Sequence, residues 1–182
     1  QPACLVGNNH HQVPFEGEDI QIFERDVPGE NEAGLSGQEV QDVLPLETCQ
    51  TMNGMWGYKI KDQNYKSAAT LIRLLVRTAA KGANLLLNIG PQPDGTLPAT
   101  ALRRLREMGE WLRANGHTIY GTRAGGVTIG DDIVSTRNDD TLFLHCIGDT
   151  IPTEITLPSG RTIKPDRAGE SNDCDYIISV RL

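Results

Sequence analysis

Hydrophobic and polar positions follow two different patterns along this chain, and the change falls near residue 122. In the first part, short apolar runs alternate with longer segments whose apolar residues recur every three or four positions, as on one face of a helix. In the second part, apolar and polar residues alternate in short segments separated by Gly, Asp, Asn and Pro. The first pattern predicts α/β structure, and the second predicts antiparallel β structure.

Two helices are predicted in the first part. Residues 62–81 carry one apolar stripe at helical spacing, and Gly82 follows where a helix commonly ends. Pro98 is well placed to begin a second helix, whose apolar face runs to Asn115 before Gly116 ends it. The stripe of the first helix consists of Ala68, Leu71, Ile72, Leu75, Val76 and Ala79.

Strands are predicted on either side of these helices. Residues 4–7 are apolar and are interpreted as a buried strand, while residues 19–24 alternate and predict a short strand within a long loop, 12–45. Residues 84–89 form an apolar run typical of a parallel strand covered on both faces. This order predicts a right-handed βα repeat, in an open sheet or a barrel, and the sequence does not separate the two.

The second part predicts a β-sandwich, with a boundary near residues 123–126. We therefore expect two domains, 1–122 and 123–182. The predicted strands of the second are 127–129, 133–137, 141–146, 154–157 and 176–182.

Composition and net charge narrow the classes of molecule that the chain is expected to bind. A net charge of −7 over 182 residues disfavours nucleic acid and anionic membrane surfaces, and permits a neutral ligand such as a sugar. No apolar run approaches the roughly 20 residues of a membrane span. The chain starts at Gln1 without a signal-like segment, so we expect a piece cut from a longer protein or a processed product, and the compartment stays open.

The cysteines show no CxxC or zinc-ligand spacing, and they are interpreted as free buried thiols. A disulfide between Cys146 and Cys174 is the alternative. Nucleotide-binding glycine motifs and a serine nucleophile elbow are also missing from the sequence. The four cysteines are Cys4, Cys49, Cys146 and Cys174.

Two segments have the residue types of a sugar pocket. Residues 47–58 are predicted to form a loop that holds a carboxylate, amides and the aromatic residues Trp56 and Tyr58, and the run at 84–89 stops in a turn at 91–95. Aromatic faces cover the C–H surfaces of sugars, while carboxylates and amides bind hydroxyls. Trp56 with Tyr58 is the best aromatic platform, and packing in the core is the alternative.

Glycoside hydrolysis needs two carboxyl groups, roughly 5–5.5 Å apart in retaining enzymes. Glu24 ends the predicted strand 19–24 and is a candidate acid catalyst; an ordinary surface pair with Arg25 is the alternative. Glu47 lies in a semi-apolar stretch and is either a catalytic carboxylate or a structural anchor.

The histidines do not predict a metal site. His10 and His11 are adjacent, so on an extended chain they point in opposite directions and do not chelate one metal. Either could hydrogen-bond a sugar hydroxyl. His117 and His145 are interpreted as surface or packing residues.

Several motifs together resemble the α-L-fucosidases of the retaining glycoside hydrolase type, over Gln1 to about Tyr120. That family folds as a (β/α)8-like barrel followed by a C-terminal β-sandwich, so the resemblance implies the C-terminal part of such a barrel followed by a small antiparallel β-sandwich. The motifs are Gly7-Asn-Asn-His-His11, Glu18-Asp-Ile-Gln-Ile-Phe-Glu-Arg25, Leu46-Glu-Thr-Cys49, Trp56-Gly-Tyr58, Gly82-Ala-Asn-Leu-Leu-Leu-Asn-Ile-Gly-Pro91 and Asp94-Gly95.

The resemblance also implies roles. The family works by double displacement, in which an Asp nucleophile forms a fucosyl-enzyme; that Asp is expected upstream of Gln1. Glu24 matches the acid/base position, with Glu18 and Glu47 as lesser candidates. His10 falls where many members have an Arg that contacts fucose, and Trp56 matches the aromatic that faces the sugar.

The family uses no metal or organic cofactor, so the resemblance implies none here. The implied ligand is a fucosylated glycan, and the missing N-terminal half of the barrel or a second copy of the chain is a further expected partner. The resemblance is compatible with a periplasmic, secreted or lysosomal-type compartment, and the sequence does not choose among them. The alternative function is a non-catalytic carbohydrate-binding or scaffold module.

Overall fold

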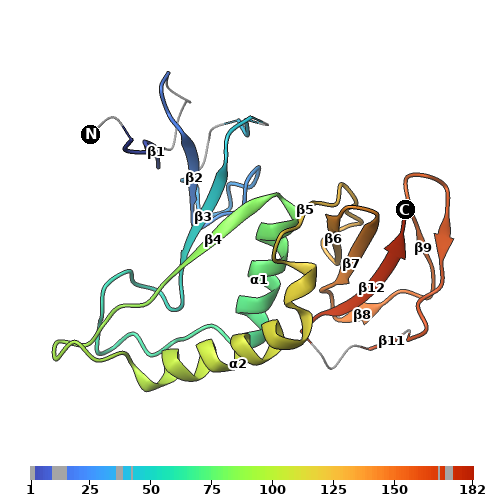
Figure 1. The fold of residues 1–182 in the computed structure, drawn as a ribbon. Helices are drawn as coiled ribbons and strands as arrows, with labels where there is room; N and C mark the ends of the chain where they lie inside the picture. The colour runs from blue at the N-terminus through green and yellow to red at the C-terminus, as the bar shows by residue number, and fades with distance from the viewer. Residues whose placement is uncertain (1–2, 10–15, 36–38, 42, 168, 171–173) are drawn as a thin grey trace. The chain divides into compact units, whose positions relative to one another are not determined.

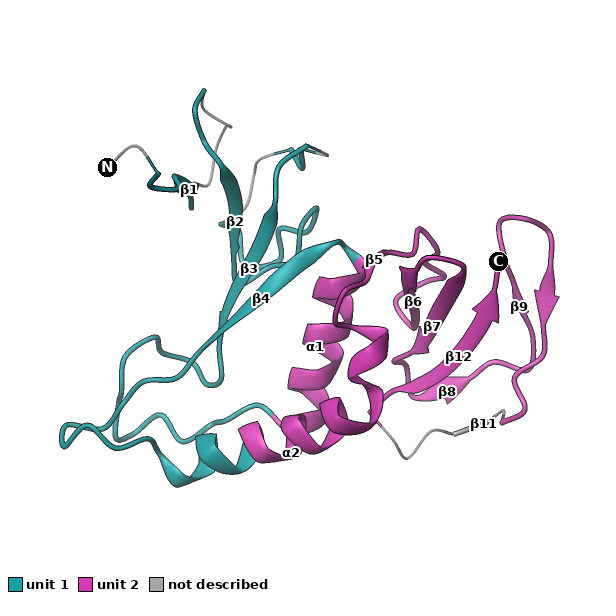
Figure 2. Cartoon of the chain, viewed as in Figure 1, with its two compact units in different colours: residues 1–66, 81–104 teal, residues 67–80, 105–182 magenta. Residues whose placement is uncertain are grey.

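The structure is a computed structural model that describes residues 3–9, 16–35, 39–41, 43–167, 169–170 and 174–182. It is a mixed α/β protein, as predicted, with one parallel sheet and several antiparallel ones. The chain divides into two compact units, coloured separately in Figure 2: residues 1–66 with 81–104, and residues 67–80 with 105–182. The predicted domains, 1–122 and 123–182, group the residues differently and stay a prediction.

The first unit contains a four-stranded sheet in which every neighbouring pair is parallel (Figure 1). Phe23, Leu46 and Ala83 form a buried cluster on one face of it. Because side chains alternate along a strand, Glu24 and its register partner Cys49 project from the opposite face. The strands, in spatial order, are β1 (Gly7–Asn8), β2 (Ile20–Glu24), β3 (Leu46–Thr51) and β4 (Ala83–Asn88).

β1 and β4 form the two edges of this sheet, and two predictions of burial were wrong there. β4 was expected to be covered on both faces, yet Leu86 is 47% exposed and Leu85 is half-buried. Residues 4–7 were expected to be a buried strand, yet only Gly7 continues into β1 and Leu5 is 68% exposed. An apolar run indicates a strand, but burial also requires neighbours on both sides, which the described part of the sheet does not supply.

β3 was not predicted, because residues 47–58 were interpreted as a loop throughout. The structure makes residues 46–51 a strand paired with β2 and β4, and only the remainder is irregular. Thr48 and Thr51 are fully buried in it. Their β-branched side chains favour the extended backbone, although their hydroxyls make the segment look polar.

The second unit combines helices with antiparallel β structure. Its main sheet has the order β12-β7-β6-β5. Two separate two-stranded sheets, β8 with β11 and β9 with β10, are also present. The predicted strands at 133–137, 141–146 and 176–182 are confirmed to within one residue. The elements are α1 (Ala68–Ala80), η1 (Gly116–Thr118), β5 (Arg123–Ala124), β6 (Ile133–Asn138), β7 (Thr141–Cys146), β8 (Thr150–Ile151), β9 (Ile155–Thr156), β10 (Thr162–Ile163), β11 (Gly169–Glu170) and β12 (Tyr176–Arg181).

The helices agree well with the sequence pattern. α2 (Ala99–Asn115) continues from the first unit into the second and matches the predicted 98–115. α1 ends as predicted, but it begins at Ala68 rather than near residue 62. Ser67 explains the later start, because its Oγ accepts a hydrogen bond of 3.0 Å from the backbone N–H of Thr70, as an N-cap residue does.

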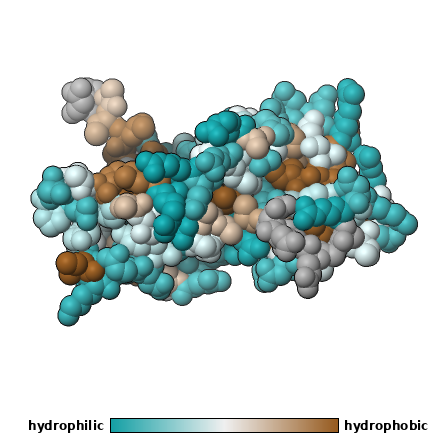
Figure 3. Space-filling view, turned by 90° about the horizontal axis from the view of Figure 1, so that it is seen from below, coloured by the Kyte–Doolittle hydropathy of each residue, from teal (hydrophilic) through white to brown (hydrophobic). Residues whose placement is uncertain are grey.

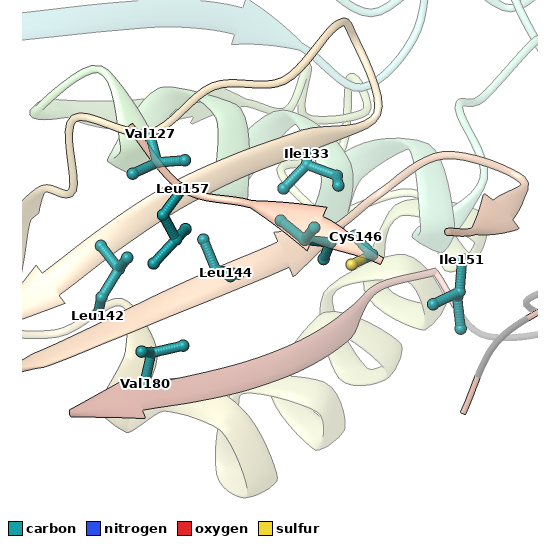
Figure 4. Close-up of a cluster of buried hydrophobic side chains, with 9 residues drawn as sticks. Val127, Ile133, Leu142, Leu144, Cys146, Ile151, Leu157 and Val180 are labelled. Atoms are coloured by element: carbon teal, nitrogen blue, oxygen red, sulfur yellow. The ribbon is translucent and has the colours of Figure 1, made fainter. Parts of the chain in front are cut away.

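One face of the main sheet in the second unit packs into an apolar core, shown in Figure 4. The core takes alternate residues of β6, β7 and β12, and closes against residues from β8, β9 and the loop before β6. The other face carries Val134 and Phe143, and α1 lies against β5 and β6. The buried core residues are Val127, Ile133, Leu142, Leu144, Cys146, Ile151, Ile155, Leu157 and Val180.

All four cysteines are free thiols, as predicted. Their predicted burial holds only for Cys146, since Cys4 is exposed and Cys49 and Cys174 are half-buried. Among the described helices, none combines the length and the apolar composition needed to cross a bilayer.

Candidate functional site

Polar side chains gather where the strands of the parallel sheet end. In open or closed α/β sheets, ligands bind at the carboxyl ends of the strands. Here β2 ends in Glu24, β3 ends in Thr51 and β4 ends in Asn88, while Asn9 follows β1. This carboxyl edge is therefore the candidate functional site of the first unit.

Glu24 is held by two N–H donors from different segments. Its Oε1 accepts a hydrogen bond of 3.1 Å from the indole Nε1 of Trp56, and its Oε2 accepts one of 3.1 Å from Nδ2 of Asn9. The side chain is half-buried. Two residues that the sequence predicted for the site, Glu24 and Trp56, are thus in direct contact.

Arg25 does not form the simple surface pair with Glu24 that was the alternative. Its guanidinium lies 5.3 Å from the centroid of the Trp56 ring, and its Nη2 donates 3.0 Å to the carbonyl of Gly54. The backbone of Arg25 has φ 68°, in the left-handed region that is costly for a residue with a side chain. Gln50 Nε2 donates a hydrogen bond of 3.0 Å to the Arg25 carbonyl and so holds this turn in place. The turn directs the side chains of Glu24 and Arg25 to different partners.

The loop that carries Trp56 is fastened to the ends of β3 and β4. Asn88 Nδ2 donates 2.7 Å to the carbonyl oxygen of Trp56 and 3.2 Å to Oγ1 of Thr51. Thr51 Oγ1 lies 3.1 Å from the carbonyl of Met55, to which it donates. The aromatic side chain therefore stands on a loop whose backbone is tied to the sheet at several points.

Gly90 brings the segment after β4 against the same loop. A Cβ added at Gly90 would lie 2.5 Å from the backbone N of Tyr58 and 2.7 Å from the carbonyl carbon of Gly57. Only glycine permits this close approach. Tyr58 itself is half-buried, next to the backbone that Gly90 touches.

Lys66 binds backbone carbonyls at the start of the loop that carries Trp56. Its Nζ donates 2.7 Å to the carbonyl of Thr51 and lies 3.5 Å from that of Asn53. Burial lowers the pKa of Lys66, and the positive charge of Arg25 lowers it further, while Asp62 acts in the opposite direction. The ammonium group is thus a partly desolvated donor that serves backbone carbonyls.

The two lesser carboxylate candidates lie away from the carboxyl edge. Glu47 is half-buried and pairs in register with Ile22, which lies two residues before Glu24 on β2. Burial raises the pKa of the Cys49 thiol, and the negative charges of Glu24 and then Glu47 add to the effect. Glu18 is buried and accepts a hydrogen bond from Nδ2 of Asn8. Because it precedes β2 whereas Glu24 ends it, the length of the strand separates these carboxylates.

His10, the remaining candidate, lies outside the described residues. Sequence reasoning did not single out Asn9, Thr51 or Asn88 as members of the site. A usable signal was present, since each of them closes or follows a strand at the edge where ligands bind. Seeing it required the strand β3, which the sequence analysis had missed.

A parallel sheet whose carboxyl edge presents a carboxylate, amides and an aromatic ring has the elements of a carbohydrate-binding site. The sequence profile of the family described as Alpha-L-fucosidase matches residues 1–117. The chain therefore belongs to the α-L-fucosidase family.

Individual relatives agree. The chain is 36% identical over 117 residues to the plasma alpha-L-fucosidase of Homo sapiens, a match that covers 61% of this chain and 25% of the relative. It is 43% identical over 121 residues to that of Pongo abelii, covering 63% of this chain and 26% of the relative. The chain thus spans about a quarter of the length of these relatives.

Solved structures share the fold over most of the chain. The alpha-L-fucosidase isoenzyme 1 of Paenibacillus thiaminolyticus superposes with a TM-score of 0.71 at 26% identity, over 91% of this chain and 45% of that one. The alpha-L-fucosidase of Vibrio sp. strain EJY3 gives 0.69 at 21% identity, over 90% of this chain and 33% of that one. These neighbours also extend well beyond the part that matches this chain.

Proposed function

We propose that this chain supplies the acid/base half of an α-L-fucosidase active centre, which releases terminal α-L-fucose from glycans. The single observation that carries the proposal is the half-buried carboxylate of Glu24 at the carboxyl edge of the parallel sheet, held between Trp56 and Asn9. Membership of the α-L-fucosidase family gives the substrate class.

The reaction proceeds by retaining double displacement. In the first step Glu24 donates a proton to the glycosidic oxygen, while an Asp carboxylate attacks the anomeric carbon and the aglycone leaves. In the second step Glu24 removes a proton from water, which displaces the Asp and releases fucose. The attacking Asp is proposed to lie in a part of the enzyme that this chain does not include. Trp56 and Tyr58 offer ring surface to the sugar, and His10 is proposed to contact a hydroxyl.

The finer architecture follows from the same proposal. The parallel strands β1–β4 are the C-terminal part of a (β/α)8-like barrel, and the antiparallel unit is the C-terminal β-sandwich. Support comes from the all-parallel register of the first sheet and from the antiparallel register of the second. In this proposal the remaining barrel strands pair with β1 and β4, next to the exposed side chains of Leu5, Val6 and Leu86.

A chimera tests the proposed function. Residues 1–117 of this chain replace the matching segment of the human plasma enzyme, and release of 4-nitrophenol from its α-L-fucoside is measured. We expect the folded chimera to turn over, while the 182-residue chain alone does not. Glu24→Gln should lower kcat by about 10²- to 10⁴-fold, the usual contribution of an acid/base group.

Glu18→Gln and Glu47→Gln serve as the controls, since Glu18 precedes β2 and Glu47 lies near the start of β3, both away from the carboxyl edge. Both should retain most of the turnover. A folded chimera that is inactive, or one in which Glu24→Gln has no effect, would contradict the proposal.

A further inference from the structure

The geometry points to Asn88 as a positioning residue for Glu24. We infer that Asn88 fixes the backbone of Trp56, and that Trp56 in turn fixes the carboxylate of Glu24 through its indole N–H. The inference rests on the proposed function only in taking Glu24 as the acid/base group. It adds a role for the end of β4, whose side chains contact neither of the oxygens on Glu24 in the described contacts.

The first step of the chain of contacts consists of two hydrogen bonds donated by Asn88. Asn88 Nδ2 is 2.7 Å from the Trp56 carbonyl and 3.2 Å from Thr51 Oγ1, so both of its hydrogens have acceptors. Register places Asn88 opposite Thr51 across β3 and β4. The amide therefore bridges the sheet to the loop from a rigid strand end, and a shorter or donor-free side chain would release the Trp56 backbone.

The second step runs from the loop to the carboxylate. The indole Nε1 can donate only one hydrogen bond, and that bond goes to Oε1 of Glu24 at 3.1 Å. The Arg25 guanidinium lies over the ring and limits its rotation. A carboxylate with one oxygen on Trp56 and the other on Asn9 has a defined plane, so shifting the Trp56 backbone rotates that plane.

Gly90 controls the same loop independently of hydrogen bonding. A side chain at this position would meet the backbone of Tyr58 at 2.5 Å, and backbone atoms cannot yield as a flexible side chain can. Gly90→Ala must therefore push the segment that follows Trp56 away from β4. Two chemically different changes, at Asn88 and at Gly90, are thus expected to disturb one indole–carboxylate contact.

The test uses the 182-residue chain labelled with ¹⁵N and needs no catalysis. The chain has two tryptophans, so it gives two indole N–H signals, and Trp111→Phe assigns them. Both signals are followed while the pH is lowered from about 7 to about 3, the range in which carboxyl groups become protonated. The Trp56 signal should move in one step, and Glu24→Gln should abolish that step.

Asn88→Leu keeps a side chain of similar size, removes both N–H donors and adds no group that titrates, and we expect it to reduce the pH-dependent movement of the Trp56 signal at least about twofold. Gly90→Ala should do the same. Asn84→Ala, on an exposed residue of β4, and Gly57→Ala, where a Cβ meets open space, should leave the movement unchanged.

The Trp111 signal reports whether each variant is folded. If Asn88→Leu does not fold, Gly90→Ala decides the question alone. A full pH-dependent movement in either folded variant would overturn the positioning role. Loss of the movement would support it even if the chimera proved inactive, so the two proposals fail separately.

Discussion

The buried pair of His145 and Asp175 belongs to a hydrogen-bond network that identifies the donor in the contact of His145 with Thr136. Both side chains are 0% exposed, and His145 Nδ1 lies 2.7 Å from Asp175 Oδ2. Thr136 Oγ1 donates its single proton to the Thr118 carbonyl at 2.6 Å, so it can only accept from His145 Nε2 at 3.2 Å. Nε2 is therefore protonated. Of the two interpretations, surface or packing residue, burial supports packing for His145, and the network joins η1, β6, β7 and the residue before β12.

Breaking this pair should destabilise the chain strongly. Asp175→Asn leaves a buried imidazole without its carboxylate, and we expect the free energy of unfolding to fall by about 3 kcal/mol. Asp149→Asn is the control, because Asp149 pairs with Arg73 at 3.4 Å while 95% exposed, and its loss should change stability by less than about 1 kcal/mol. Urea denaturation followed by circular dichroism measures both. Equal effects of the two substitutions would show that burial adds nothing to the first pair.

The Cys146 thiol should make stability depend on pH in the alkaline range. Burial, and then the charge of Asp175, raise the pKa of Cys146 to about 11. Between the unfolded value near 9 and this value, the folded chain binds more protons than the unfolded chain, so stability falls as the pH rises. Cys146→Ala should be less stable at pH 8 yet show a shallower decline from about pH 9 to about pH 11. Parallel slopes in urea denaturation series would contradict this prediction.

At the scale of the element, the N-terminus of α1 depends on one side chain. Ser67 Oγ accepts from the Thr70 N–H at 3.0 Å, and the Ser67 carbonyl accepts the first helical bond from Leu71 N at 3.1 Å. Ser67→Ala should lower the free energy of unfolding by about 1 kcal/mol, while Ser67→Asp, which can still cap, should lower it by a few tenths at most. Thermal unfolding of both variants provides the measurement, and equal losses would argue against capping.

The sequence pattern predicted elements better than their surroundings. α2 and the strands β6, β7 and β12 were found from periodicity, because alternation and helical spacing are properties of the chain itself. The start of α1 was misplaced because the apolar stripe has no marker other than Ser67, and the Glu or Gln of a full capping box is replaced by Thr70. The burial of β4 could not be predicted, since it depends on which strands lie beside it.

The candidate site shows the same limit. Glu24 and Trp56 were identified separately and prove to be in contact, at 3.1 Å between Oε1 and Nε1. Asn88 was missed as a partner because it lies 32 residues from Trp56 along the chain, and only the register of β3 with β4 brings them together. Nor does the sequence indicate that Arg25 adopts φ 68° and turns toward the indole ring.

At the scale of the whole molecule, apolar side chains reach the surface at several places, as the face in Figure 3 shows. The exposed apolar residues include Leu5 and Val6, just before β1, and Leu86 on β4. The strands β1 and β4 are the two edges of the parallel sheet. Sheet edges offer unpaired backbone groups as well, so apolar residues there favour association with another strand. Under the proposed barrel architecture, the occupant of these edges is the rest of the barrel, and a second copy of the chain is the alternative.

Leu86→Lys tests this view of the β4 edge. A charge on the exposed face of an edge strand opposes strand pairing, so the variant should sediment as a smaller species than the natural chain at equal concentration, without loss of thermal stability. Leu97→Lys is the control, because Leu97 is 37% exposed but lies outside the strands. In the chimera, Leu86→Lys should also lower the yield of active enzyme, because in the proposed barrel a further strand pairs with β4 and lies beside Leu86. Equal sedimentation of all three proteins would contradict the prediction that β4 is a surface through which this chain associates with itself.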